Sequence, residues 1–153
     1  MGGIYETWMD MAILAAGMDH LDIPIGAALC DERGVLVGLS RNSREADGSL
    51  LGHAESNVIF ESWEKGQFGS LEGFTLVSTL EPCLVCAGII RETGITRVVY
   101  GAPNPQRGAG GSVYDLLRDT RLGRPLEVIA GIKAEECQTL LDNFFARLRN
   151  QCR

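Results

Sequence analysis

The apolar positions near the N-terminus first follow a helical period and then the pattern of two short strands. Residues 5–19 carry apolar side chains at intervals of three and four, which predicts a helix. Residues 25–30 and 35–39 form two largely apolar runs, separated by the turn-forming segment 31–34. Two such runs joined by a short turn that contains glycine predict a β-hairpin. The apolar positions of the helix are Trp8, Met11, Ala12, Ala15 and Ala16.

The remainder of the chain alternates between helical and strand patterns. Residues 42–52 are polar and contain glycine, which predicts a loop. A hairpin followed by strands that alternate with helices predicts an α/β fold, in which helices cover both faces of a mixed sheet. The predicted helices are 54–65, 83–93 (ended by Gly94), 112–119 and an amphipathic 133–149; the predicted strands are 74–78, 96–100 and 126–130, with a loop at 101–111.

Length and composition fit one compact domain spanning 1–153. The chain has 153 residues, of which 45% are hydrophobic and 22% charged, and it shows no internal repeat or linker. These values exclude a disordered or fibrous protein. No segment reaches the ~20 apolar residues of a membrane span, and the N-terminus lacks the basic and apolar regions of a signal peptide. We therefore expect a cytoplasmic protein without a membrane partner.

The charge is acidic overall but unevenly distributed. The formal net charge is −6, which disfavours a strongly basic nucleic-acid-binding protein. Residues 1–90 carry a net charge of −9, whereas residues 91–153 carry +3. The positive half is most simply explained by solvated helix faces and turns; the alternative is a local surface that faces phosphate groups. Its central arginines are Arg91, Arg97, Arg107, Arg118, Arg121 and Arg124.

Two short motifs contain the residue types of a catalytic zinc site. His53-Ala54-Glu55 precedes Pro82-Cys83-Leu84-Val85-Cys86, and each motif lies at the start of a predicted helix. One imidazole and two thiolates suit tetrahedral Zn²⁺ with a fourth position open to water. A Cys-x-x-Cys pair alone is also found in redox proteins and in half of a structural zinc site, but this chain has no second pair to complete four cysteine ligands. Glu55 is placed to exchange a proton with the water, as in the H-x-E and P-C-x-x-C motifs of zinc deaminases.

Four further stretches extend the pattern over most of the chain: 79–88, 97–102, 108–112 and 136–145. With these motifs the sequence resembles the cytidine deaminase superfamily, and in its framework the bacterial tRNA adenosine deaminases. The resemblance implies a three-layer α/β/α fold with a five-stranded mixed sheet and a homodimer. It also implies that His53, Cys83 and Cys86 bind zinc and that Glu55 shuttles protons.

The segment before His53 differs from that of the tRNA enzymes. Their Asp-Pro-Thr-Ala stretch is replaced by Ser49-Leu50-Leu51-Gly52, and the pair Gly48-Ser49 resembles fungal cytosine deaminases. Pro103-Asn104-Pro105 replaces a stretch that carries Arg and Asp in the tRNA enzymes, while the C-terminal lid of the fungal enzymes is missing. We therefore expect hydrolytic deamination of a free nucleobase or similar amino-heterocycle as a small-molecule substrate. The alternatives are deamination of the tRNA wobble adenosine, with tRNA as partner, and a non-catalytic zinc-stabilised module.

Five residues are candidates for contacting the substrate. Asn42 lies eleven residues before His53, where both subfamilies place a base-contacting asparagine; alternatively it satisfies its own turn. The backbone N–H of Ala54 is expected to hold the polar edge of the ring. Ile25 and Leu51 are candidates for the wall of the base pocket, although core packing explains them equally well. Asn104 belongs to the proline-containing loop beside the base.

Overall fold

The computed structural model describes residues 3–18 and 21–153, and its centre is a five-stranded sheet with the order β2-β1-β3-β4-β5. Strand β1 pairs antiparallel with β2 and β3, whereas β3, β4 and β5 run parallel, so the sheet is mixed. The elements in chain order are α1 (Ile4–Ala16), β1 (Gly26–Cys30), β2 (Leu36–Arg41), α2 (Ala54–Gly66), β3 (Thr75–Leu80), α3 (Leu84–Thr93), β4 (Arg97–Ala102), a 3₁₀ turn η1 (Thr120–Leu122), β5 (Glu127–Ile129) and α4 (Ala134–Gln151).

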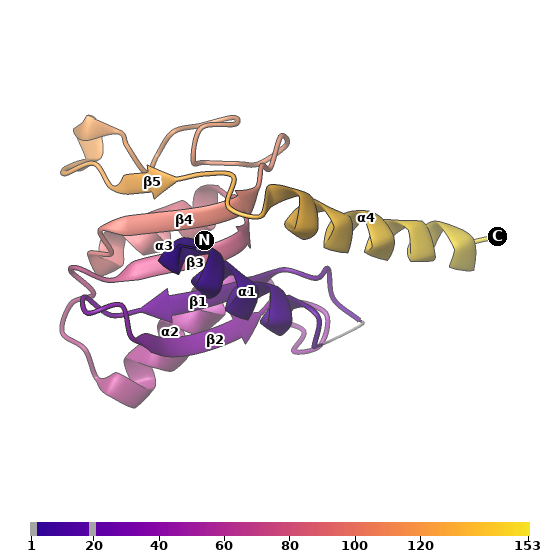
Figure 1. Cartoon of the computed structure of the whole chain (residues 1–153), viewed down its shortest axis with the longest axis horizontal. Helices are drawn as coiled ribbons and strands as arrows, with labels where there is room; N and C mark the ends of the chain where they lie inside the picture. The colour runs from indigo at the N-terminus through magenta and orange to yellow at the C-terminus, as the bar shows by residue number, and fades with distance from the viewer. Residues whose placement is uncertain (1–2, 19–20) are drawn as a thin grey trace.

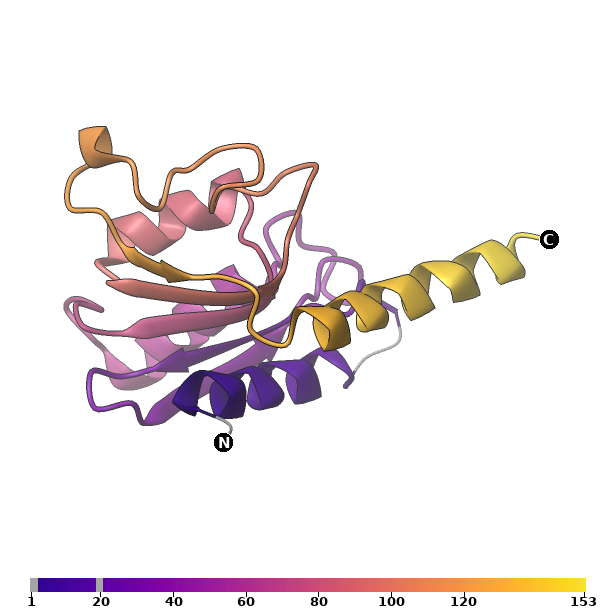
Figure 2. The same ribbon diagram turned by 45° about the horizontal axis from the view of Figure 1, so that its top comes forward.

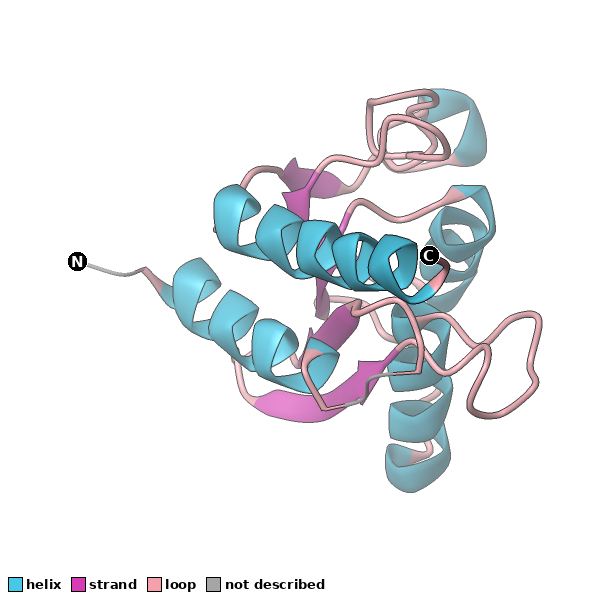
Figure 3. Ribbon diagram, turned by 90° about the vertical axis from the view of Figure 1, so that its right-hand side faces the viewer, coloured by secondary structure: helices cyan, strands magenta, loops and turns pink. Residues whose placement is uncertain are grey.

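Two layers of helices cover the sheet, which confirms the predicted three-layer architecture. Helices α1 and α4 lie on one face, and α2 and α3 lie on the other (Figures 1 and 3). Each face has its own apolar cluster, because successive side chains of a strand point to opposite sides. Leu76 and Val98 pack beneath α2 and α3, whereas their neighbours Val77 and Val99 pack beneath α1. Strands β1 and β4 therefore carry mainly apolar residues, whereas β3 also holds the buried polar residues Thr75, Ser78 and Thr79.

Helix α1 packs directly on the backbone of β1. A Cβ atom at Gly26 would lie 1.9 Å from the carbonyl oxygen of Ala12, so only glycine permits this approach. The predicted helix at 5–19 ends earlier, at Ala16 with Gly17 as its C-cap, and residue 19 lies outside the described residues. Helix α4 starts beside β4 and projects beyond the edge of the sheet (Figures 1 and 2). Across the described part of the chain, no helix is both long and apolar enough to span a membrane.

The short helix predicted at 112–119 does not form. The backbone N–H groups of Val113 and Tyr114 both donate to the carbonyl of Gly108, and Gly110 forms an isolated bridge with Asp115. The N–H of Ser112 donates to the carboxylate of Glu81. A helix over 112–119 would need the N–H of Leu116 for the carbonyl of Ser112, but this N–H donates to the carbonyl of Ala109. Tertiary contacts therefore override the local helical pattern. The only short helical turn in this region is η1, at Thr120–Leu122.

Candidate active site

The starts of helices α2 and α3 bring three possible metal ligands together. His53 is the N-cap of α2, Cys83 is the N-cap of α3, and Cys86 lies in the first turn of α3. The Nδ1 atom of His53 lies 3.3 Å from Sγ of Cys86 and 3.6 Å from Sγ of Cys83. All three ligand atoms lie within 4.8 Å of one another. The two motifs predicted from the sequence therefore form one cluster.

The spacing of these atoms fits tetrahedral zinc. Zn–N and Zn–S bonds of ordinary length at a tetrahedral angle place the nitrogen and sulfur atoms about 3.6 Å apart. The observed separations of 3.3 and 3.6 Å agree with that value. Imidazole and thiolate are also the donor types that zinc prefers over oxygen-binding cations. The cluster supplies three ligands, which is the number found in catalytic rather than structural zinc sites.

The electrostatics of the cluster favour one thiolate even without a metal. A hydrogen bond from Cys86, together with one from His53, lowers the pKa of Cys83 to about 3. The same hydrogen bond to Cys83 and burial raise the pKa of Cys86, while the bond to Cys83 raises the pKa of His53. Neither N-cap side chain caps its own helix, so the helix N-terminal N–H groups also favour the negative charge.

Glu55 lies in the first turn of α2, beside the cluster. Its side chain is 5% exposed, and the hydroxyl of Ser78 on β3 donates a hydrogen bond of 3.0 Å to its Oε1 atom. Burial raises the pKa of Glu55, and the bond from Ser78 opposes this effect. A buried carboxylate with a raised pKa is suited to take up and release protons near neutral pH. Glu55 therefore has the surroundings of a general acid and base.

A cavity of about 600 Å³ opens onto His53, Glu55 and Cys83, at the carboxyl ends of β3 and β4. Four predicted substrate contacts line it, namely Ile25, Asn42, Ala54 and Asn104. The predicted contact Leu51 does not line it and is 58% exposed. The remaining lining residues are Ile23, Arg44, Leu80, Glu81, Pro103, Pro105, Gln106, Arg107, Gln138, Leu141 and Phe145.

Asn42 faces the cavity but also stabilises its own turn. Its side-chain amide donates to the carbonyl of Ile23 at 3.3 Å, and its Oδ1 atom accepts a bond of 3.4 Å from the N–H of Arg44. Both interpretations of Asn42 therefore have a structural basis. The two bonds are long for their type, so they exchange readily for a bond to a bound ring.

The sequence did not reveal two groups of residues at the site. Ser78 was assigned only to a strand, although its alternation with the apolar residues of β3 is a signal that its hydroxyl occupies a special position. Gln138, Leu141 and Phe145 come from α4. The amphipathic pattern of that helix predicts a buried face, but it does not distinguish a residue that faces the core from one that faces a cavity.

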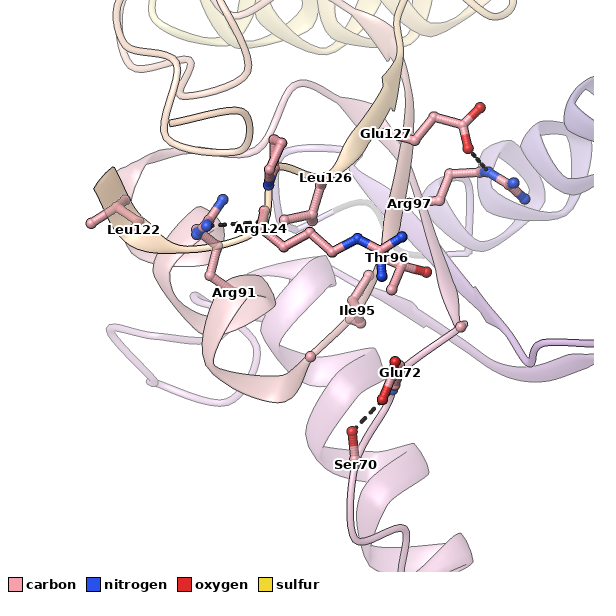
Figure 4. A pocket seen from close by; sticks show the side chains of 13 residues that line it. Ser70, Glu72, Arg91, Ile95, Thr96, Arg97, Leu122, Arg124, Leu126 and Glu127 are labelled. Carbon is pink, nitrogen blue, oxygen red and sulfur yellow. Dashed lines mark hydrogen bonds and ion pairs between the residues drawn. The ribbon is translucent and has the colours of Figure 1, made fainter. Parts of the chain in front are cut away.

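A second cavity, of about 650 Å³, lies near the start of β4, at the opposite end of the parallel strands (Figure 4). Arg91 donates to the carbonyls of Leu116, Leu117 and Arg124, and Arg97 pairs with Glu127 at 2.8 Å. Two of its arginines are thus occupied by the protein itself. Its lining contains none of the ligand cluster, so the chemistry belongs to the first cavity.

Comparisons with known proteins agree with this geometry. The family model for the cytidine and deoxycytidylate deaminase zinc-binding region matches residues 4–102. A Bacillus subtilis (strain 168) relative named tRNA-specific adenosine deaminase is 38% identical over 148 residues, which are 95% of this chain and 91% of the relative. A tRNA(Ile)-lysidine synthase from Deinococcus radiodurans is 37% identical over 92% of this chain, but only 24% of that relative is covered. A solved structure from studies of A-to-I editing by tRNA:A34 deaminases at the wobble position of transfer RNA has a TM-score of 0.82 and 30% identity, covering 88% of this chain and 99% of that one.

The sequence-based prediction of a free nucleobase substrate is wrong. The relative matched along nearly its whole length and the similar solved structure are both described as deaminases of tRNA adenosine. The prediction rested on the segments 48–52 and 103–105, which differ from those of the tRNA enzymes, and on the acidic net charge. Residues 103–105 do line the cavity. Residues 48–52 are all described, and none of them lines the cavity. A change in this segment therefore carries little information about the group that enters the site.

Proposed function

The chain belongs to the cytidine and deoxycytidylate deaminase family, whose members depend on zinc, and we propose that it deaminates adenosine at the wobble position of a tRNA to inosine. The observation that carries the proposal is the end-to-end match to a tRNA-specific adenosine deaminase. The similarity to part of a tRNA(Ile)-lysidine synthase supports it, because the name of that relative also refers to a tRNA.

His53, Cys83 and Cys86 would hold the zinc ion, which when bound supplies a Lewis acid that makes water a nucleophile near neutral pH. Glu55 accepts a proton from the attacking water as the C6–O bond forms. It passes this proton to ring nitrogen N1, then takes the second proton from the new hydroxyl group at C6 and passes it to the amino group. Ammonia leaves as the C6–N bond breaks and the C6 carbonyl forms. The burial of Glu55 and its bond to Ser78 support this role, because they hold the carboxylate in one place away from bulk solvent.

The cavity offers both polar and apolar surfaces to an extruded base. Asn42 and Ala54 line the cavity, and we assign the Asn42 amide and the N–H of Ala54 to the polar edge of the ring. Ile25 and Phe145 approach from separate elements and supply apolar walls. Asn104 lies in the loop after β4, which forms a further side of the cavity. This combination suits a heterocycle that is gripped at its edge and covered on its faces.

Two arginines favour a polyanionic substrate over a free base. Arg44 lies in the loop after β2, Arg107 lies in the loop after β4, and both line the cavity. Neither forms an ion pair with the described residues, so both guanidinium groups are available to phosphates on either side of the target nucleotide. Their charge acts locally, where the overall charge of −6 would repel RNA.

We also propose that the protein acts as a homodimer through the outer faces of α2 and α3. Four large apolar side chains of these helices are exposed to 40% or more, and exposed apolar surface is what protein–protein contacts cover. Sedimentation at micromolar concentration should show a dimer, and Trp63→Glu should shift it toward the monomer. A wild-type monomer under these conditions contradicts this proposal. The four side chains are Phe60, Trp63, Leu84 and Val85.

The test of the function is a substrate panel analysed by mass spectrometry for the deaminated product of each substrate, namely inosine, xanthosine, hypoxanthine or uracil. It should contain an anticodon stem-loop with adenosine at the wobble position, the same stem-loop with guanosine there, free adenine, adenosine and cytosine. We expect conversion of the first substrate alone. Glu55→Gln should retain zinc and lose activity by about 10²–10⁴-fold, since a positioned acid and base contributes that much. The proposal would be refuted if the protein did not deaminate the adenosine stem-loop but did deaminate a free base.

A further inference from the structure

Glu81 is a buried carboxylate with no role in the chemistry described above. It follows β3 directly, lies two residues before Cys83, and is 1% exposed. Within the described residues it has no cationic partner. A charged group in such a place is strongly disfavoured unless hydrogen-bond donors surround it.

All of the donors to Glu81 come from one segment, the loop after β4. Oε1 accepts bonds from the N–H of Asn104 at 3.2 Å and from the hydroxyl of Ser112. Oε2 accepts bonds from the N–H groups of Gly110 at 3.0 Å and Ser112 at 3.1 Å. Bonds to an ionised carboxylate are about twice as strong as neutral ones, so four of them clamp this loop to the end of β3.

The clamped loop is also a wall of the cavity. Its residues 103–107 line the cavity beside His53 and Cys83. Gly108 allows the loop to come this close, because a Cβ atom there would lie 2.2 Å from Oε2 of Glu81. The same glycine pairs with Cys83 in an isolated bridge, and the N–H of Ala109 donates to the carbonyl of Pro82. The loop is thus held against both the carboxylate and the segment that supplies the cysteine ligands.

We propose that Glu81 is a positioning residue, which fixes the loop 103–112 so that its cavity-lining part is already in place when the substrate arrives. Glu81 borders the cavity, but its two oxygens are fully used by the loop, so it acts through Asn104 and its neighbours. A preformed wall lowers the ordering needed on binding. This inference rests on the proposed function, because it treats the loop as a surface for the target nucleotide.

The first test is Glu81→Gln in the full-length zinc-loaded protein. An amide offers only one acceptor oxygen and directs its own N–H groups at the backbone donors of Gly110 and Ser112. We expect KM for the adenosine stem-loop to rise at least tenfold, with kcat changed less than threefold and zinc content unchanged. Amide hydrogen exchange at Gly110 and Ser112 should accelerate at least tenfold. Glu81→Asp keeps the charge and should restore part of the KM.

Asp31→Asn is the matched control. Asp31 is also a buried carboxylate that accepts two backbone N–H bonds of 2.9 Å, from Arg33 and Val35, but it lies in the β1–β2 turn at the other end of the sheet. Its loss should leave KM and kcat at wild-type values. Ser112→Ala removes one donor to Glu81 at an exposed residue, so it should fold normally and raise KM about two- to fivefold.

Several results would overturn the inference. Wild-type KM in both Glu81→Gln and Ser112→Ala excludes a positioning role, and so does an equal rise of KM in Asp31→Asn. Loss of zinc from Glu81→Gln assigns Glu81 to the support of Cys83 instead. If the wild-type protein does not deaminate the stem-loop, the proposed function is wrong. Hydrogen exchange at Gly110 and Ser112 in Glu81→Gln still shows whether Glu81 holds the loop.

Discussion

The hydroxyl of Ser78 donates a hydrogen bond of 3.0 Å to Oε1 of Glu55, and both side chains lie inside the protein. The bond links β3 to the first turn of α2 across the sheet–helix boundary. Because the neighbouring β3 residues Val77 and Leu76 are locked in the two apolar clusters, Ser78 has little freedom to move. The orientation of the Glu55 carboxylate is therefore set by its bond to the sheet.

Ser78→Ala should lower kcat by about 10- to 100-fold while zinc content stays at one ion per chain. A hydrogen bond to a charged group contributes about 1.5–3 kcal/mol, and about 1.4 kcal/mol corresponds to a factor of ten. Ser62→Ala is the control, since Ser62 is equally buried but its hydroxyl has no hydrogen-bond partner among the described residues. The kcat of both variants is measured by steady-state kinetics with the adenosine stem-loop as substrate. An unchanged kcat in Ser78→Ala removes Ser78 from the site.

The five cysteines should differ in their reaction with a disulfide reagent such as dithiodipyridine. Cys152 is the exposed thiol and should react rapidly in the zinc-loaded protein. Burial raises the pKa of Cys30 to about 12 and that of Cys137 to about 11, so both should react only on unfolding. Removal of zinc by a chelator should free the Cys83 thiolate, whose pKa is low, raise the number of reactive thiols from about one to about two, and abolish turnover. Cys86 is 1% exposed and has a raised pKa, so it should stay unreactive. Equal reactivity before and after chelation contradicts the metal ligands proposed here.

The salt dependence of substrate binding should report on Arg44 and Arg107. Each phosphate contact contributes about 0.7–0.9 to the slope of log affinity against log salt concentration. Arg44→Ala and Arg107→Ala should each reduce the slope for the stem-loop by roughly that amount. Arg33→Ala removes the same charge from the β1–β2 turn, where the side chain is 75% exposed, and should leave the slope unchanged. Equal effects of all three substitutions would indicate that only the total charge matters.

Gly26→Ala should destabilise the fold. A methyl group there meets the carbonyl oxygen of Ala12 at 1.9 Å and the amide nitrogen of Ala16 at 2.7 Å, so α1 must move away from β1. Forced overpacking of this kind costs about 1–3 kcal/mol, which corresponds to a decrease in Tm of roughly 2–12 °C for a chain of this size. Gly69→Ala is the control, because a methyl group there has open space. Thermal unfolding of the two variants should differ clearly; similar Tm values would contradict the packing of α1.

Local sequence patterns were sufficient to predict most of the helices and strands and the zinc-binding motifs. The predicted helices at 54–65 and 83–93 put His53 and Cys83 at helix starts, and the structure finds both at N-cap positions. The strand at 25–30 was found because both of its faces are buried and its sequence is largely apolar. The helix predicted at 112–119 does not form, because hydrogen bonds to Gly108 and Glu81 determine the conformation of these residues.

The residues that form the walls of the cavity could not be predicted from local sequence patterns. Asn42 was named from the family resemblance, and Ile25 and Leu51 were named together as possible pocket walls, yet Leu51 does not line the cavity. Phe145 reaches the cavity from a helix that begins after β5, and no local pattern records where that helix lies on the sheet. The zinc cofactor follows from two short motifs, which explains why it was predicted correctly while the substrate was not.

The convergence of two helix starts on one ligand cluster also makes the cofactor a cross-link. His53 and Cys83 are 30 residues apart in the chain, and an ion bound to both closes a loop of that length. In the chain-entropy model, a permanent link across such a loop disfavours the unfolded state by about 3–4 kcal/mol. Helices α2 and α3 make few direct contacts with each other, so an ion bound to residues at both helix starts adds a link between them. Metal supply then governs how long the protein persists in the folded state, in addition to whether it can react.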